Sequence, residues 1–321
     1  MTDRPKLEST FKLDHNPTPL VGWDFNVAVF DVYRWYEKIS GSFKKEVEEK
    51  LVKGAFALHI NRGPSMLPRH TYRMMFVADF RFEETGNYWR NDIIRSSEVV
   101  RQAWVDHAEA GGVSVDTLRT DYKGTRGEKT EDFWFVYNIC RKYATEYFPF
   151  FEEEGYEADD WCGSIYRLSR DSDPDSIVHK RQILLATLDR DWSMCVADEH
   201  NVYFANTRVP FPKEKIQERL VGNQGVIEHT KHRMSHDISH PKELAAKKVL
   251  SADWGDNLPV GTPVELFDLC EPHPVYNIDK VSRYGELIEC VNDPKPNCRP
   301  DHFDSTLRQF AKIMLEAPVK L

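Results

Sequence analysis

The sequence predicts an α/β fold in which a mostly parallel central sheet carries helices on both faces. Short apolar runs typical of buried strands lie at residues 18–24, 73–79, 182–188 and 201–206. Helical patterns lie at residues 27–50, 131–147, 157–170 and 241–250. Strands that alternate with helices form parallel sheets covered on both sides. In such sheets ligands bind beyond the carboxyl ends of the strands.

The composition indicates a folded, soluble chain. Of its 321 residues, 40% are hydrophobic and 12% aromatic, which is enough to build a sizeable core. The six cysteines are scattered without any C-x-x-C pair, so we expect reduced thiols in a cytoplasmic protein (host cytoplasm if viral). The polar start lacks the apolar run of a signal peptide. We expect a monomer without membrane contact.

The net charge of −9 disfavours a protein that coats DNA through a basic surface. It does not exclude a metal-assisted phosphodiesterase, because a cluster of metal-binding carboxylates would account for most of the excess. Bound cations would then offset part of that charge.

Carboxylates follow three of the predicted strands. Asp24, Asp79 and Asp189 each end an apolar run. Since parallel strands present their carboxyl ends at one edge of a sheet, we expect these side chains to converge.

Further acidic residues stand in short clusters. Glu157, Asp159 and Asp160 begin a helical pattern, where capping and the helix dipole offer an alternative explanation. Asp189 and Asp191 follow a strand, where turn formation is the alternative. The stretch Asp253-Trp-Gly-Asp256-Asn-Leu-Pro adds two more acids.

Taken together, the acids predict a metal centre. Unpaired carboxylates that lie close together repel one another and raise their pKa values unless cations neutralise them. Oxygen ligands without His or Cys select Mg²⁺, with Mn²⁺ as a substitute. Two such ions suit phosphodiester hydrolysis.

The order of these motifs resembles the flap endonuclease/5′-nuclease superfamily, and most of all the 5′-nucleases of the bacteriophage ribonuclease H type. Gly155-Tyr-Glu157-Ala-Asp159-Asp160 is similar to one signature of this family, and Asp253-Trp-Gly-Asp256-Asn-Leu-Pro to another. Asn87-Tyr-Trp-Arg90 and Asp121-Tyr-Lys-Gly-Thr-Arg126-Gly resemble further blocks. The likeness spans roughly residues 20–270.

The resemblance implies a role for each matching residue. The first metal ion would be bound by Asp24, Asp79, Glu157 and Asp159, with Asp160 nearby. The second ion would be bound by Asp189, Asp191 and Asp256, partly through water. Arg90 and Lys123 would act as catalytic contacts to the scissile phosphate. Arg119 and Arg126 would support the strand that passes through a helical arch, and Tyr122 or Tyr88 would stack on a terminal base.

The resemblance also implies an organisation. Residues 15–240 would form the nuclease core, with the arch segment at about 90–130. Residues 241–275 would form a helix–three-turn–helix-like element that binds duplex DNA, and residues 276–321 an extension of unknown role. The implied partners are DNA, RNA–DNA hybrids and replication proteins.

Two departures from the family pattern leave alternatives open. More residues separate Arg90 from Lys123 than separate the arginine and lysine of the family pattern. Arg119 is therefore an alternative to Arg90 as the contact to the scissile phosphate. The helix–three-turn–helix is abbreviated to Leu-Pro-Val-Gly261-Thr262-Pro, which puts its potassium site in doubt. Gly261 and Thr262 still offer backbone amides to a phosphate.

Two other functions compete with a nuclease. A haloacid-dehalogenase-like phosphatase would use Asp189 and Asp191, but it leaves the earlier carboxylates unused. A catalytically silent nucleic-acid-binding relative would explain the altered spacing in the arch segment, but the chain keeps every expected metal ligand.

Overall fold

The computed structural model describes most of the first 262 residues. The described ranges are 19–62, 73–81, 86, 88–124, 126–171, 181–187, 189, 191–200, 202–206, 220–234, 238–241, 243–262, 309 and 312–313. None of the helices in these ranges is long and apolar enough to cross a membrane.

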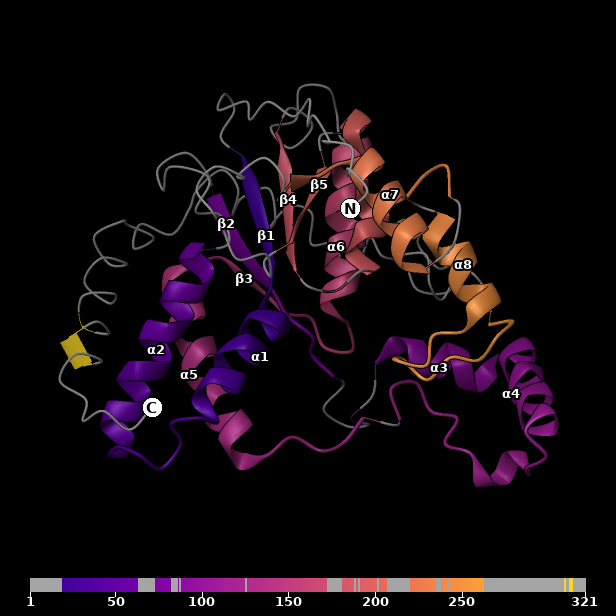
Figure 1. The fold of residues 1–321 in the computed structure, drawn as a ribbon, viewed down its shortest axis with the longest axis horizontal. Helices are drawn as coiled ribbons and strands as arrows, with labels where there is room; N and C mark the ends of the chain where they lie inside the picture. The colour runs from indigo at the N-terminus through magenta and orange to yellow at the C-terminus, as the bar shows by residue number, and fades with distance from the viewer. Residues whose placement is uncertain are drawn as a thin grey trace, which may run out of the picture.

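A six-stranded sheet forms the centre of the fold, in the order β3-β2-β1-β4-β5-β6 (Figure 1). Its strands are β1 (Leu20–Asp24), β2 (Arg73–Val77), β3 (Phe150–Phe151), β4 (Ile183–Thr187), β5 (Val202–Asn206) and β6 (Leu220–Val221). The first five in this order are parallel, and β6 is antiparallel to β5. The predicted fold class is confirmed.

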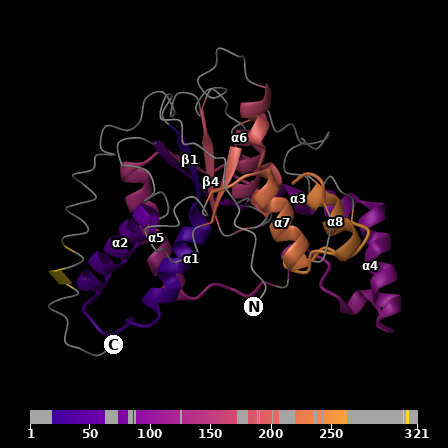
Figure 2. The ribbon, with the colours of Figure 1, turned by 45° about the horizontal axis from the view of Figure 1, so that its top comes forward.

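Helices cover both faces of this sheet (Figures 1 and 2). On one side lie α1 (Phe25–Tyr36), α2 (Lys45–Arg62) and α5 (Glu131–Tyr147), and on the other α6 (Ala158–Asp171) and α7 (Asn223–Met234). Beyond α7 follows α8 (Glu243–Ser251). Strands β1 to β5 each supply residues to two cores. Trp23 packs with α1, α2 and α5, whereas Leu20 packs with α6. Burial on both faces explains why the strands read as continuous apolar runs.

The arch segment holds α3 (Trp89–Ser96), α4 (Glu98–Ala110) and a 3-10 turn, η1 (Val115–Thr117). The two helices lie beside α8 in both views (Figures 1 and 2). Tyr88, Val100 and Trp104 are buried in the core on the α6 side. Part of the segment is therefore packed structure.

One expectation about the helices needs correction, and another lies mostly outside the described residues. The helical pattern at residues 27–50 contains two helices, because the chain turns between α1 and α2 at Gly41, which has a φ of 73°. Residues 263–275 of the expected duplex-binding element lie outside the described residues. So does the extension at 276–321, apart from residues 309, 312 and 313.

Candidate metal centre

The carboxylates gather at the carboxyl edge of the sheet, as the sequence predicts. Asp24 is the last residue of β1, and Asp79 and Asp189 follow β2 and β4 by two residues. Glu157 immediately precedes α6, and Asp159 and Asp160 lie in its first turn.

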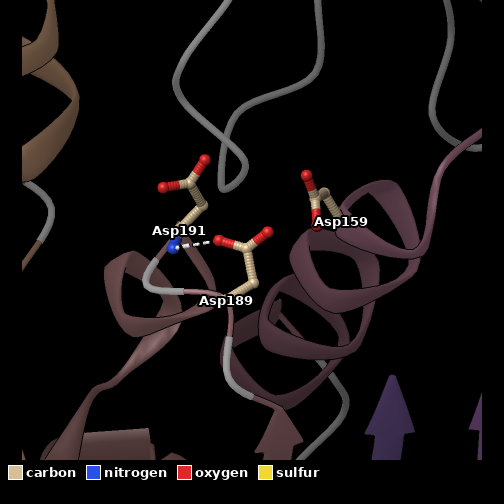
Figure 3. A group of neighbouring side chains, drawn as sticks. All are labelled: Asp159, Asp189 and Asp191. Carbon is tan, nitrogen blue, oxygen red and sulfur yellow. Dashed lines mark hydrogen bonds between the residues drawn. The ribbon is translucent and has the colours of Figure 1, made fainter. Parts of the chain in front are cut away.

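Three of these side chains form the first acidic group, Asp159, Asp189 and Asp191. One oxygen of each lies within 4.8 Å of the others, which is close enough to share a metal ion. Their carboxyl groups gather on one side of the α6 start and the β4 end (Figure 3). The indole Nε1 of Trp192 donates to Asp159 at 2.8 Å, and the backbone N–H of Asp191 donates to Asp189 at 3.0 Å. Neutral donors thus orient Asp159 and Asp189 without cancelling their charge.

Asp191 also belongs to the second acidic group, with Asp253 and Asp256, whose oxygens lie within 4.8 Å of one another. Backbone hydrogen bonds between Asp253 and Leu258 close the turn that carries this group. The side chain of Asn257, at a φ of 61°, donates to the backbone oxygens of Arg119 and Asp121. The turn is therefore fixed against the arch segment.

Asp24 and Asp79 are held by neutral donors. Asp24 accepts hydrogen bonds from the Thr187 hydroxyl at 2.8 Å and from the Val27 amide, which it caps at the start of α1. Asp79 accepts from the amide of Ala158, the first residue of α6. Both carboxylates serve the local structure as well as the acidic site.

Three carboxylates of the site, Asp24, Asp159 and Asp191, have raised pKa values. Burial, followed by the charges of Asp79 and Asp189, raises the pKa of Asp24 to about 7. Burial and the charge of Asp189 raise the pKa of Asp191 to about 7, even though Lys248 opposes the shift. The same two causes raise the pKa of Asp159 well above its usual value. The site therefore carries repulsion that a cation would relieve.

Basic side chains neutralise the neighbouring acids. The Arg90 guanidinium donates two hydrogen bonds of 2.8 and 3.1 Å to Asp160 and one of 2.8 Å to Glu157. Lys123, at a φ of 55°, pairs with Glu157. Burial acts to raise the pKa of Glu157, but Lys123 and Arg90 outweigh it and lower that pKa. For Asp256, Lys123 and Arg126 likewise outweigh burial and lower its pKa.

The two residues predicted to contact the scissile phosphate, Arg90 and Lys123, are paired with carboxylates of the site. Arg90 is 4% exposed and Lys123 9%, and both are engaged with carboxylates. Of the two candidate arginines, Arg90 lies at the acidic site, while Arg119 donates to the backbone oxygen of Gly124. In this conformation the two site cations compensate charge and do not present themselves to solvent.

The other predicted nucleic-acid contacts divide in a similar way. Tyr122 is 6% exposed, and its hydroxyl donates to Glu157 at 3.0 Å and to Asp256 at 3.3 Å, so its ring is not placed for stacking on a base. Arg126 is partly exposed and pairs with Asp256 at 2.5 Å. The amide of Gly261 donates to Val249 and that of Thr262 to Pro259. Neither amide is available to a phosphate in this arrangement.

The grouping of the acids also differs from the expected one. Asp159 lies with Asp189 and Asp191, because Trp192 holds it toward the end of β4, while Arg90, Lys123 and Tyr122 engage Glu157. Asp253, to which the resemblance gave no ligand role, completes the second acidic group. The contact of Lys248 with this group was not predicted, and its side chain is 15% exposed. The spacing of five residues between Lys248 and Asp253 gave no signal of their contact.

The donor set fits hard divalent cations. Both acidic groups offer carboxylate oxygens alone, which are the ligands of Mg²⁺ and Mn²⁺. Six of the eight predicted ligands (Asp24, Asp79, Glu157, Asp159, Asp189 and Asp191) follow strands or begin α6, and Asp256 approaches from the turn after α8. The eighth, Asp160, is engaged with Arg90 and with the Trp89 indole.

Comparison with curated proteins gives a match to a DNA polymerase. DNA polymerase I of Chloroflexus aurantiacus is 28% identical over 224 residues, or 66% of this chain. The chain spans about a fifth (21%) of the length of that polymerase. No family model matches.

Solved structures of bacteriophage T5 proteins also match. A T5 5′-exonuclease with bound zinc is 14% identical, with a TM-score of 0.44, and the match covers 92% of this chain and 99% of that one. A T5 flap endonuclease in complex with DNA and metal ions is 14% identical, with a TM-score of 0.43 and coverages of 93% and 100%. This chain is similar to both T5 proteins over most of its length.

Proposed function

We propose that this chain is a divalent-metal-dependent 5′-nuclease. Its substrates would be phosphodiester bonds at DNA flaps, nicks or RNA–DNA primers, and its setting DNA replication or repair. Two things support the proposal: the resemblance of the motifs to the 5′-nuclease superfamily, and the acidic site.

One observation carries the proposal: two acidic groups share Asp191 and lie at the carboxyl edge of a parallel sheet. Carboxylates such as Asp24 and Asp159 retain raised pKa values there. A folded chain tolerates this repulsion when a bound cation compensates it. Two divalent ions in such a site supply an activated water and offset charge on the leaving oxygen.

The residues of the chain would divide the remaining work. The acidic groups would hold the ions, with Trp192 fixing the orientation of Asp159. Arg90 and Lys123 would face the scissile phosphate when it enters, exchanging a carboxylate partner for a phosphate oxygen. Arg126 would assist from the partly exposed end of the arch segment.

The test uses 5′-labelled flap, nicked and single-stranded DNA and an RNA–DNA hybrid, incubated with the chain in Mg²⁺, Mn²⁺ or EDTA. We expect short 5′ products that depend on the metal ion. Binding to DNA without cleavage would instead indicate a silent relative. Hydrolysis of small phosphate esters alone would indicate a phosphatase.

A variant pair tests the site itself. Asp189→Asn removes one charge from the first acidic group at nearly constant volume, so we expect cleavage to fall by at least about a thousandfold. DNA binding should stay within a few-fold. Asp116→Asn, on the exposed turn η1, is the matched control and should cleave like the unaltered chain. Near-normal cleavage by Asp189→Asn would contradict the proposed metal centre.

A further inference from the structure

Lys248 lies inside the second acidic group. It comes from the last turn of α8, and its Nζ is 2.5 Å from an oxygen of Asp191 and 2.5 Å from an oxygen of Asp253. Its side chain is 15% exposed. The ammonium therefore bridges two of the three carboxylates that would share an ion.

The two acidic groups consequently differ in their balance of charge. The second group has three carboxylates and two cationic partners, since Arg126 pairs with Asp256. The first group has three carboxylates and one cationic partner, because Lys248 pairs with Asp191, while Asp159 and Asp189 accept hydrogen bonds from an indole and a backbone amide without net charge. A divalent ion is thus attracted more strongly by the first group than by the second.

Lysine suits a reversible role at this position. Its ammonium is a compact point charge on a flexible stem, so it can leave a site without rearranging the backbone. A doubly charged ion at the second group would repel Nζ and take over both of its carboxylate contacts. The ion and the ammonium therefore compete for Asp191 and Asp253.

We propose that Lys248 takes the place of the second divalent ion in the metal-free chain. The two ions then bind in sequence, tightly at Asp159, Asp189 and Asp191, and weakly at Asp191, Asp253 and Asp256. The inference rests on the proposed metal-dependent function, and it adds a built-in competitor that sets the concentration at which the second ion binds.

Binding of Mn²⁺ tests the inference without any nucleic acid. Free Mn²⁺ is measured by electron paramagnetic resonance in the unaltered chain, in Lys248→Gln and in the neighbouring control Lys247→Gln. We expect one tight and one weak site in the unaltered chain. Lys248→Gln should strengthen the weak site by about tenfold or more, and Lys247→Gln should leave both sites unchanged. A weak site of equal affinity in Lys248→Gln would overturn the proposal.

A second measurement needs no variant, so the test survives if Lys248→Gln fails to fold. Reductive methylation followed by mass spectrometry reports how accessible Lys248 is in the unaltered chain. We expect slow labelling without ions and at low Mn²⁺, and faster labelling once the weak site fills. Labelling that stays constant as the second ion binds would refute the exchange. If the chain binds no Mn²⁺ at all, the proposed function itself fails.

Discussion

The buried carboxylates of the acidic site fall into two regions that differ in whether cationic side chains neutralise them. Around Glu157 and Asp160, buried carboxylates are matched by Arg90 and Lys123 in the structure itself. Around Asp159 and Asp189, the partners are neutral donors, and charge remains uncompensated. In the first region, side chains of the protein neutralise the carboxylates. In the second region, the carboxylates keep charge that a bound cation could neutralise. A count of acidic residues in the sequence treats the two alike.

The largest effect on stability should come from the first region. Arg90→Ala would leave Asp160 and Glu157 buried without their guanidinium, which costs about 3–5 kcal/mol. Urea denaturation in EDTA measures this change. Arg101→Ala removes an exposed ion pair with Glu98 and should leave the urea midpoint nearly unchanged. Similar losses for the two variants would mean that Arg90 does not neutralise this region of the site.

Lys123→Ala should lower cleavage by about 10²–10³-fold, which corresponds to about 2.7–4 kcal/mol of transition-state stabilisation. Because Lys123 also neutralises buried Glu157, the variant should unfold at lower urea concentration as well. Single-turnover cleavage of a 5′ flap and denaturation in EDTA measure the two effects. Lys129→Ala, farther along the arch segment, is the control. Normal cleavage by Lys123→Ala would separate this lysine from the chemistry.

The carboxylates with raised pKa values predict that the stability of the fold depends on pH. Asp24 and Asp191 have pKa values of about 7 in the folded chain and near 3.8 when unfolded. The stability that they contribute is complete below pH 3.8 and is lost as the pH rises through 7. Mn²⁺ should restore it, so the stabilisation by Mn²⁺ should be about 2–3 kcal/mol greater at pH 7.5 than at pH 5. Thermal melting with Mn²⁺ and with EDTA at both pH values would show it. An equal shift at both pH values would argue against ion binding at these carboxylates.

The smallest effect concerns orientation. Trp192→Phe keeps most of the buried ring but removes the indole donor to Asp159. We expect Mn²⁺ to bind the first acidic group about tenfold more weakly. Calorimetric titration measures this constant. Trp104→Phe alters a buried indole in α4 and serves as the control. Equal affinities in the two variants would show that Trp192 does not position Asp159.

Much of the fold could be predicted from the sequence, because buried parallel strands leave a plain pattern. The apolar runs that end at Asp24 and Asp189 became β1 and β4. The two-residue strands β3 and β6 were too short to give such a pattern. The break between α1 and α2 was missed because the residues around Gly41 are polar, and a polar sequence fits an exposed helix as well as a turn.

The site was predictable as a set of residues but less so as an arrangement. Chain order and the strand ends indicated where the acids converge, as at Asp24 and Asp189. The partners of each acid depend on contacts between distant segments, such as Lys248 with Asp191, separated by 57 residues. Spacing along the chain carries no information about such a contact. For the same reason the sequence could not show that Arg90 and Tyr122 are buried.

The link between the arch segment and the acidic turn has a mechanical consequence. The amide of Lys123 donates to the backbone oxygen of Asp256, and Asn257 holds two carbonyls of the arch segment. These hydrogen bonds connect residues 119–124 to residues 253–258. A load that pulls Lys123 away from Glu157 therefore reaches Asp256 through the backbone. Under the proposed function, a strand that displaces Lys123 would therefore also displace Asp256, a residue of the second acidic group.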